Sequence, residues 1–348
     1  MKAAVLEEVG RLEIKDVDEP KCPPDGLLIK VAACAVCGTD VKVLHHGHRL
    51  LVPPRITGHE VTGTIVEVGE ELRGYHVSRR VAVAPAVPCG KCYYCQRGIQ
   101  GMCENLTAIG YHYDGGFAEY MAVPGVAVKN GCVSSVPPGV SFEEAALAEP
   151  LACCINAQEL MEVSLGDVVV IMGAGPIGCL NAGLARARGA GRVILTDIRK
   201  ERLKLAEKVA DADLYLNLTG EELKERIFGE TERRGADKVI VACSSARAQE
   251  ESLGLVAKRG VVDFFGGLPK DDPYIKFNSN LLHYREFSVL GNHGSAPRHN
   301  VLALDLIAAG QIKVKGLITH CFNISDTLKG IRVTEAAEGL KVIIEGEP

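Results

Sequence analysis

The chain has 348 residues, of which 47% are hydrophobic and 24% charged, and its formal net charge is −5. This length is enough for two domains with separate cores, and the acidic balance excludes a general positive field for nucleic acid. The cysteine count is thirteen, so complete internal pairing is impossible, and thiols or metal ligands are favoured over a disulfide scaffold.

The sequence shows no signal for export or membrane anchoring. Glu7 and Glu8 come too early for a secretory signal. The most apolar stretch, residues 168–185, is broken by glycines and a proline before it could span a bilayer. We therefore expect a cytoplasmic protein with neither a membrane nor a nucleic-acid partner.

The first 130 residues contain short apolar runs separated by tight turns. Each run is rich in Val, Ile or Ala and is bounded by Gly or Pro, which is typical of strands in an antiparallel β domain or barrel. The predicted strands are 26–36, 60–69, 79–85 and 116–123.

Helical character begins at residue 141. Ser141 and Glu144 have the spacing of a capping box, in which a hydroxyl and a carboxylate satisfy free backbone amides. Pro150 interrupts the helical pattern, because a proline disfavours the α conformation of the residue before it but is tolerated in the first turn of a new helix. Glu149 is therefore expected at a helix junction, with its carboxylate aimed by the backbone instead of lying on a helix face.

The pattern changes near residue 166. Six apolar runs alternate with helical stretches such as 200–210 and 248–259, which predicts an α/β fold with a doubly wound parallel sheet. The runs are 168–172, 192–197, 213–218, 237–243, 260–267 and 287–291. A helix at 300–310 follows, and the remaining tail is too small for its own core, so we expect it to pack on the first domain.

A glycine-rich turn follows the first of these six strands and opens a helix. Such glycines allow a tight turn and bring pyrophosphate close to the positive helix N-terminus. The predicted cofactor-binding residues of this turn are Gly173, Gly175, Pro176, Ile177 and Gly178.

An acidic residue ends the second of these strands. The carboxylate of Asp197 can accept hydrogen bonds from both ribose hydroxyls, and it would repel a 2′-phosphate. NAD is therefore favoured over NADP as the cofactor. Arg199 and Arg202 follow closely and keep NADP open, and we include Arg202 among the cofactor-binding residues.

Two groups of metal-ligand residue types stand out. The first is a set of four cysteines, Cys89, Cys92, Cys95 and Cys103. By residue type alone it could be a disulfide staple, a nucleic-acid-binding knuckle, a redox centre or a structural clasp, and the odd cysteine count and net acidity argue against the first two. The second group is Cys37, His59, Glu60 and, farther along, Glu149; a catalytic zinc uses three protein ligands and leaves a fourth position open.

The order of these motifs resembles one family along nearly the whole chain. The C-G-T-D segment at 37–40, G-H-E at 58–60, the four cysteines, E-P-L at 149–151 and the glycine turn are similar to those of the zinc-dependent medium-chain dehydrogenases, in the sorbitol (polyol) and threonine dehydrogenase branch. The resemblance implies a GroES-like β-barrel catalytic domain from residues 1–151 and 292–348, with a lobe at about 88–104. It implies a Rossmann NAD-binding domain at 152–291.

The resemblance also implies two zinc ions per chain. Cys37 and His59 would bind the catalytic zinc, and Glu149 or Glu60 would supply the carboxylate. Asp40 would orient His59, and Thr39 would pass on the proton of the alcohol. The four cysteines would form a closed structural site. Cys153 and Cys154 follow Glu149 closely in sequence and are alternative ligands.

The substrate is less defined than the reaction class. Lys42 stands where many relatives carry the histidine that ends the proton relay, and it could substitute, act through water or bind substrate. The arginine–tyrosine pair of sorbitol dehydrogenases is missing, with Gly294 and Ser295 near those places. The basic stretch 42–49, with Tyr111, His112 and His293 as possible additions, suits a polyol, sugar acid or polyol phosphate.

We therefore expect a zinc-dependent NAD enzyme that oxidises a secondary alcohol of a polyhydroxylated substrate to a ketone. A threonine 3-dehydrogenase-like enzyme is the alternative, and a non-catalytic zinc- and NAD-binding protein is a further one. The resemblance implies a homo-oligomer, either a tetramer or a dimer.

Overall fold

The computed structural model describes residues 1–346, so the last two residues of the expected 292–348 segment lie outside the described part. The chain divides into two compact units. The first contains Met1–Ala152, Gly294–Gly310 and the chain from Val314 onward, and the second contains Cys153–His293 and Gln311–Lys313. The expected boundaries differ from these units at three places: Ala152 falls in the first unit, and residues 292–293 and 311–313 fall in the second.

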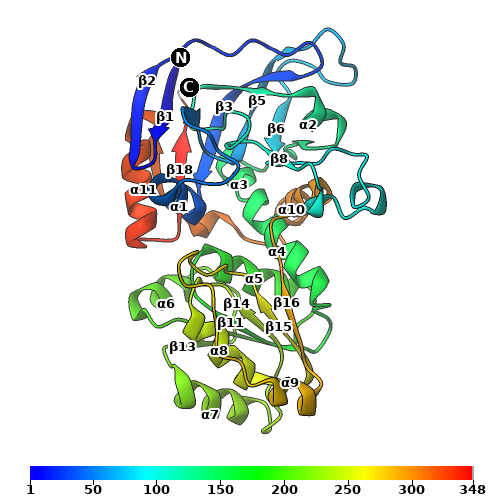
Figure 1. Cartoon of the computed structure of the whole chain (residues 1–348), viewed down its shortest axis with the longest axis vertical. Helices are drawn as coiled ribbons and strands as arrows, with labels where there is room; N and C mark the ends of the chain where they lie inside the picture. The colour runs from blue at the N-terminus through cyan, green and yellow to red at the C-terminus, as the bar shows by residue number, and fades with distance from the viewer. Residues whose placement is uncertain (347–348) are drawn as a thin grey trace. The chain divides into compact units, whose positions relative to one another are not determined.

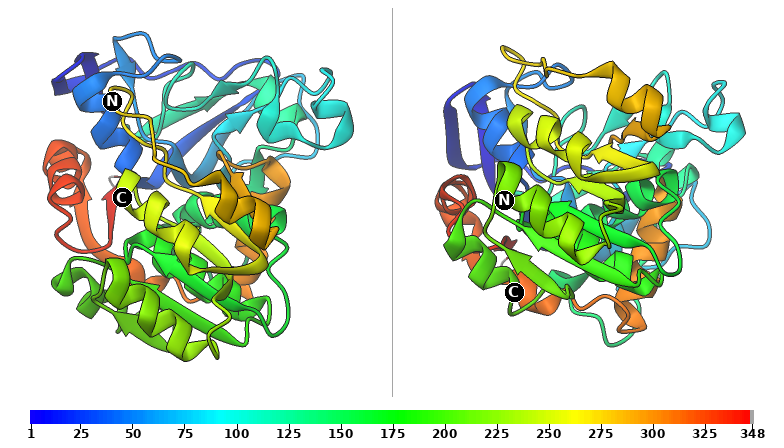
Figure 2. Two further views of the ribbon diagram at one scale, coloured as in Figure 1. Left: turned by 60° about the horizontal axis from the view of Figure 1, so that its bottom comes forward. Right: turned by 90° about the horizontal axis from the view of Figure 1, so that it is seen from below.

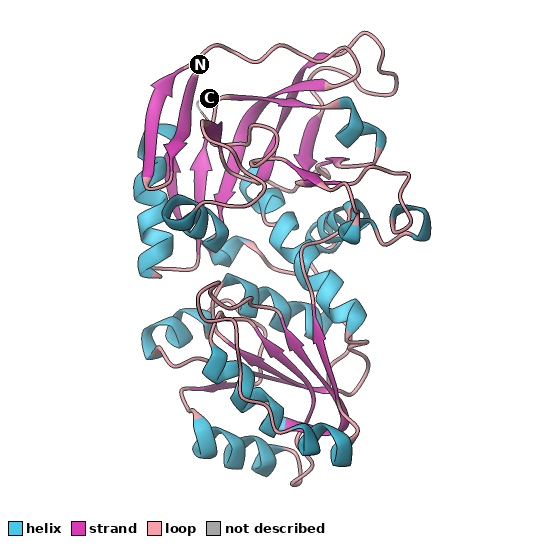
Figure 3. Ribbon diagram, viewed as in Figure 1, coloured by secondary structure: helices cyan, strands magenta, loops and turns pink. Residues whose placement is uncertain are grey.

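The first unit is mainly antiparallel β structure (Figure 1; strands magenta in Figure 3). One sheet has the order β10-β6-β5-β3-β18-β17 with β9 also paired to β3, a second has the order β2-β1-β4, and β7 pairs with β8. The strands are β1 (Lys2–Glu8), β2 (Arg11–Asp16), β3 (Leu27–Val36), β4 (Arg55–Ile56), β5 (Glu60–Val68), β6 (Arg80–Val83), β7 (Ala86–Val87), β8 (Thr107–Ala108), β9 (Tyr120–Val123), β10 (Val133–Ser135), β17 (Ile318–Asn323) and β18 (Lys341–Glu345). The four strands predicted in this unit are confirmed as β3, β5, β6 and β9.

The chain's carboxyl-terminal strand completes the centre of the main sheet. β18 pairs antiparallel with β3 and parallel with β17, and it is the red strand in Figure 1. Phe117, Ile29 and Ile344 are buried together in the core between the sheets. The first unit therefore needs both ends of the sequence before its core is complete.

The helices of the first unit are short. They are α1 (Gly38–His46), α2 (Gly125–Lys129), α3 (Phe142–Ala146), α10 (Pro297–Ala308) and α11 (Thr327–Ala336), with 3₁₀ turns η1 (Cys95–Arg97), η2 (Gln100–Met102), η3 (Lys315–Leu317) and η4 (Ile324–Asp326). The predicted capping box is confirmed: the amide of Glu144 donates to Ser141 Oγ, and the Ser141 amide donates back to the Glu144 carboxylate.

The helix junction expected near Glu149 is present, but Glu149 itself is helical. The break falls at Leu147, and α4 (Ala148–Leu160) already includes Glu149 in its first turn. Amides in the first turn of a helix have no intrahelical acceptor, so Pro150 costs α4 no hydrogen bond there. The preference of a residue before proline for extended backbone is therefore overridden at this place.

The second unit is a parallel sheet with the order β13-β12-β11-β14-β15-β16, and Figure 2 shows helices on both of its faces. All six predicted strands are confirmed. They are β11 (Val168–Met172), β12 (Arg192–Thr196), β13 (Leu214–Leu216), β14 (Ala236–Val241), β15 (Val256–Phe264) and β16 (Ser288–Gly291). The order reverses at β11, which makes this a doubly wound Rossmann-type sheet.

The helices of the second unit join successive strands. They are α5 (Pro176–Ala187), α6 (Lys200–Ala206), α7 (Gly220–Glu230), α8 (Ala246–Leu255) and α9 (Ser279–Arg285). The helix predicted at 248–259 ends at Leu255, because β15 begins at Val256, where two consecutive β-forming positions enter the sheet. No helix within residues 1–346 is both long and apolar enough to cross a membrane.

Candidate metal and dinucleotide sites

Cys37, His59 and Glu60 come together in the first unit. Their potential ligand atoms all lie within 4.8 Å of one another. Cys37 is the residue that precedes α1, and His59 and Glu60 stand where the chain enters β5. The sequence analysis named all three, and the structure brings them into one cluster.

Local backbone chemistry sets the position of Cys37. Its amide donates to Asp40 Oδ2 at 2.8 Å. The Asp40 carboxylate thus satisfies the backbone amide of the residue that caps α1, as in one half of a capping box. Thr39 Oγ1 lies 3.5 Å from Cys37 Sγ. The motif C-x-T-D thus holds the sulfur at the helix N-terminus with a hydroxyl beside it.

Gly58 allows His59 to approach this turn. Its φ is +91°, and a Cβ at this position would lie 2.8 Å from Cys34 Sγ and 2.9 Å from the Phe117 ring. Any side chain here would combine backbone strain with a clash. The glycine before the histidine is therefore a steric requirement of the cluster.

His59 is 7% exposed, and its Nδ1 lies 3.5 Å from Asp40 Oδ1. This separation is longer than an ordinary hydrogen bond, and Nδ1 has no hydrogen-bond partner within residues 1–346. The Tyr111 ring centroid lies 5.8 Å from that of His59, and burial raises the pKa of Tyr111. Tyr111 therefore lies beside the cluster as an uncharged phenol at neutral pH.

Lys341 belongs to the cluster, although the sequence analysis did not name it. Its Nζ lies 2.6 Å from both Oε1 and Oε2 of Glu60, and both side chains are buried. Burial raises the pKa of Glu60 to about 7, with Glu149 adding to this and Lys341 opposing it. Burial alone would lower the pKa of Lys341, but the charges of Glu60 and Cys37 outweigh it and raise this pKa. The sequence signal that could have identified Lys341 is a lysine at the start of the otherwise apolar strand K-V-I-I-E, because a lysine buried there needs an acidic partner.

Glu149 is outside the group whose ligand atoms lie within 4.8 Å of one another. Its negative charge nevertheless raises the pKa of Glu60, so the two carboxylates act on the same site. Cys154, the alternative ligand, is placed differently: its sulfur contacts the Asn181 amide at 3.3 Å and the Ile177 carbonyl at 3.8 Å. Cys154 therefore packs against α5.

The donor set of the cluster fits zinc. A thiol, an imidazole and a carboxylate are the ligands that catalytic zinc sites combine. The buried Nδ1 of His59 without a hydrogen bond is a further sign, because such an atom is costly unless a metal or a tightened Asp40 contact compensates it.

The four cysteines of the lobe also lie within 4.8 Å of one another. The backbone amide of Lys91 donates a hydrogen bond to the Cys89 sulfur, and this contact lowers the pKa of Cys89 to about 6. All thirteen cysteines are free. Apart from the short turns η1 and η2 the lobe has no regular structure, and Tyr93, Ile99 and Met102 are exposed on it. A tetrahedral four-thiolate set suits a structural zinc that would organise such a loop.

The glycine turn of the second unit has the geometry of a phosphate cradle. Gly173 has φ +115°, and a Cβ on Gly178 would lie 1.8 Å from the Gly173 carbonyl oxygen. Pro176 and Ile177 begin α5 directly after Gly175. The bare backbone at a helix N-terminus is what a pyrophosphate requires.

Asp197 is fixed against this turn. Its Oδ2 accepts from the Ala174 amide at 2.8 Å and its Oδ1 from the Arg199 amide at 2.7 Å. Each oxygen retains acceptor capacity for a ribose hydroxyl. Arg202 lies behind Gly175, with one guanidinium nitrogen 3.3 Å from where a Cβ would be; burial lowers the pKa of Arg202, and Asp197 opposes this.

Residues of the basic stretch at 42–49 have different surroundings. Lys42 is exposed on α1, His45 pairs with Glu335 of α11 at 2.9 Å, and the His48 ring lies 4.8 Å from the Tyr111 ring. Among these residues, His48 is linked to the metal cluster through Tyr111.

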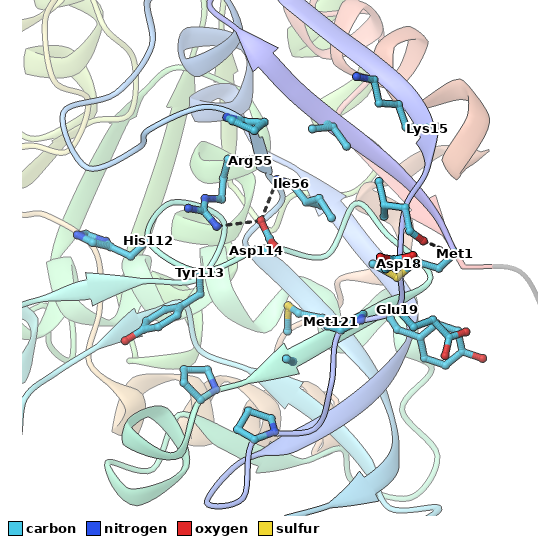
Figure 4. Close-up of a pocket in the computed structure, with 18 of the residues that line it drawn as sticks. Met1, Lys15, Asp18, Glu19, Arg55, Ile56, His112, Tyr113, Asp114 and Met121 are labelled. Atoms are coloured by element: carbon cyan, nitrogen blue, oxygen red, sulfur yellow. Dashed lines mark hydrogen bonds and ion pairs between the residues drawn. The ribbon is translucent and has the colours of Figure 1, made fainter.

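His112 is not among the metal cluster residues and lines a cavity of about 700 Å³ in the first unit (Figure 4). An ion pair between Arg55 and Asp114 stands in its wall. None of the predicted metal or cofactor residues lines this cavity.

Comparisons with known proteins agree with both units. Residues 23–132 match the alcohol dehydrogenase GroES-like domain, and residues 176–309 match the zinc-binding dehydrogenase domain. A sorbitol dehydrogenase from Halalkalibacterium halodurans is 32% identical over 99% of this chain and 99% of its own. An L-threonine 3-dehydrogenase from Pyrococcus abyssi is 36% identical over 88% of this chain and 87% of its own.

A structure from Sinorhizobium meliloti 1021, solved with NADP bound, superposes with a TM-score of 0.90 at 34% identity and covers 99% of this chain and 98% of its own. A GroES-like unit joined to a zinc-binding dehydrogenase unit defines an NAD(P)-dependent zinc alcohol dehydrogenase. The chain belongs to the zinc-dependent medium-chain dehydrogenase family, and its relatives include sorbitol dehydrogenase, D-xylulose reductase and L-threonine 3-dehydrogenase.

The buried ion pair gives a first prediction. Replacing Lys341 with methionine leaves the Glu60 carboxylate buried without its partner, which costs about 3–5 kcal/mol when a buried pair is broken. We expect Lys341→Met to lower the free energy of unfolding of the first unit by this amount, measured by urea unfolding of zinc-loaded protein. Lys315→Met, at an exposed lysine of the same unit, is the control, and an equal effect of both changes would contradict the account.

Proposed function

We propose that this protein oxidises a secondary alcohol of a polyol, sugar acid or polyol phosphate to the corresponding ketone, with NAD as the hydride acceptor. The supporting observation is the coexistence of a Cys–His–Glu cluster in the first unit with a glycine turn and fixed carboxylate in the second. A sorbitol dehydrogenase that matches along the whole chain supports the polyhydroxylated substrate class.

Cys37 and His59 would hold the catalytic zinc, with Glu60 or Glu149 as the carboxylate ligand. When bound, zinc supplies a Lewis acid at the alcohol oxygen, and the nicotinamide supplies the hydride acceptor. Lys341 keeps the negative charge of Glu60 compensated in the buried cluster. Asp40 holds the Cys37 backbone and would orient the His59 ring once their 3.5 Å contact tightens.

Thr39 would take the proton that the alcohol loses. Its hydroxyl lies 3.5 Å from the Cys37 sulfur, so it is beside any group bound at that sulfur. Lys42 lies three residues along α1, on the same side of the helix, and it is exposed. The proton would thus pass from Thr39 towards Lys42 and solvent.

Asp197 supports NAD over NADP. Two backbone amides hold its carboxylate beside the glycine turn, where a 2′-phosphate would meet a negative charge. The Arg202 guanidinium interacts with the Asp197 carboxylate. We infer that this interaction makes Arg202 less available to a 2′-phosphate.

A threonine 3-dehydrogenase-like activity is the second candidate. The observation that favours it is the 36% identity to the Pyrococcus abyssi enzyme.

The reaction is tested by measuring NAD reduction on zinc-loaded protein with neutral polyols, inositols, aldonates, polyol phosphates and L-threonine. We expect turnover on a polyhydroxylated substrate, its loss on chelation, and its loss in Cys37→Ser with NADH binding changed less than about twofold. Cys321→Ser, at an exposed cysteine, should keep full activity. Turnover on L-threonine alone would favour the second candidate, and normal turnover of Cys37→Ser would overturn the metal assignment.

Cofactor choice gives a separate prediction. Asp197→Ser removes the ribose acceptor and the charge that repels a 2′-phosphate, so kcat/KM for NAD should fall about tenfold or more while that for NADP rises. Steady-state kinetics with both cofactors measure this. Asp211→Ser, at an exposed aspartate of the same unit, should leave the preference unchanged; a wild-type preference for NADP would contradict the proposal.

A further inference from the structure

Asp263 is a buried carboxylate that the proposed mechanism does not use. The fully buried Asp, Glu and Lys side chains within residues 1–346 are Asp40, Glu60, Lys341 and Asp263. The first three belong to the metal cluster of the first unit, and Asp263 lies in β15 of the second unit with 1% exposure. A charged group so deeply buried needs a compensating partner.

That partner is Asn292, which follows β16. The Nδ2 of Asn292 donates to Asp263 Oδ2 at 2.6 Å. Asp263 is opposite Leu290 in the parallel pairing of β15 and β16, so Asn292, two residues later, is on the same face of the sheet. Burial raises the pKa of Asp263 to about 6, with the Asn292 hydrogen bond opposing, so the carboxylate form prevails at neutral pH.

An ionised carboxylate only accepts hydrogen bonds. It therefore fixes the rotamer of the Asn292 amide, because the nitrogen has to face Asp263. The amide oxygen of Asn292 is left as an acceptor of defined orientation, at a half-buried position. A buried acid that orients a less buried amide is the arrangement expected of a positioning pair.

The place of this pair in the sheet indicates what the amide would meet. In a doubly wound sheet the dinucleotide lies along the carboxyl ends of the strands, one mononucleotide on each half. The glycine turn follows β11 and Asp197 follows β12, so the adenosine half lies towards β13. β14, β15 and β16 form the other half of the sheet (Figure 1), and Asn292 is at the carboxyl end of its last strand.

Two glycines leave this edge without side chains. Gly266 and Gly267 follow β15, and a Cβ on Gly266 would lie 2.3 Å from the Cys243 carbonyl oxygen, whereas Gly267 has nothing within 4 Å of such an atom. The edge therefore combines tightly packed backbone with open space, which suits a flat ring.

We propose that Asn292, oriented by Asp263, binds the carboxamide of the nicotinamide ring through its amide oxygen. The inference rests on the proposed dinucleotide site. Asn292 is the residue that touches the cofactor, and Asp263 is a positioning residue that acts through it. The ligand group is a neutral primary amide, and its N–H is a donor whose hydrogen bond the oriented Asn292 oxygen can accept.

Calorimetric titration separates this contact from the rest of the cofactor site. NADH carries the nicotinamide and ADP-ribose does not. For Asn292→Ala we expect the Kd of NADH to rise about three- to tenfold, the value of one hydrogen bond, while the Kd of ADP-ribose stays within about twofold. The matched control is Asn280→Ala, at an exposed asparagine of α9 in the same unit, which should change neither.

The reduced 3-acetylpyridine analogue tests the donor directly, because an acetyl group replaces the carboxamide and has no N–H. Wild-type protein should bind NADH more tightly than this analogue, and Asn292→Ala should lose that preference. Asp263→Asn, which lets the Asn292 amide turn over, should lose it equally. The double variant should show no further loss, since the two residues act as one unit.

The outcomes distinguish the two proposals. If wild-type protein fails to bind ADP-ribose, the dinucleotide site itself is refuted. If wild-type protein binds both ligands but Asn292→Ala weakens them equally, or weakens neither, the carboxamide contact is refuted while the dinucleotide site stands. Equal weakening together with a lowered melting temperature would make Asp263–Asn292 a purely structural link between β15 and β16.

Discussion

The first unit depends on one buried ion pair. Glu60 begins β5 and Lys341 begins β18, and their charged groups meet at 2.6 Å with almost no exposure. Burying either charge alone would carry a desolvation penalty with no lysine or carboxylate partner to offset it. The carboxyl-terminal strand is therefore required for the metal cluster as well as for the sheet, since it delivers the buried lysine that pairs with Glu60.

In the second unit, backbone packing and backbone hydrogen bonds, instead of a buried ion pair, hold the cofactor site in place. Gly173 and Gly178 pack at distances that no side chain would permit, and the amides of Ala174 and Arg199 hold the Asp197 carboxylate. The cradle is thus rigid before any cofactor arrives, which reduces the entropy that binding has to overcome. Each unit brings one half of the proposed chemistry, a metal cluster in the first and a dinucleotide edge in the second.

Much of the fold could be predicted because the signals are local. The six strands of the second unit are continuous apolar runs, and the capping box at Ser141 is a short spacing, so neither needs knowledge of distant residues. The helix junction near Glu149 was predicted, but its exact place was not, because the proline rule describes only a preference and the unsatisfied amides of a helix start cancel its cost. The end of α8 was misplaced because Val256 and Ala257 suit either a helix or a buried strand.

The candidate site could be predicted only in part, for a related reason. Cys37, His59 and Glu60 carry recognisable residue types and spacings, whereas Lys341 is separated from Glu60 by most of the chain, and only the pairing of β18 with β3 brings it there. Tyr111 and the Asp263–Asn292 pair likewise have no local pattern, since their meaning comes from neighbours in space.

The central claim is that Cys37 and His59 hold a zinc ion distinct from that of the cysteine lobe. Anomalous diffraction recorded on either side of the zinc absorption edge, from crystals of zinc-loaded protein, tests it most directly. The account predicts two zinc peaks in each chain, one within about 2.3 Å of the Cys37 sulfur and 2.1 Å of a His59 nitrogen, and one among four sulfurs. A single peak in the lobe, with none at Cys37, would contradict it.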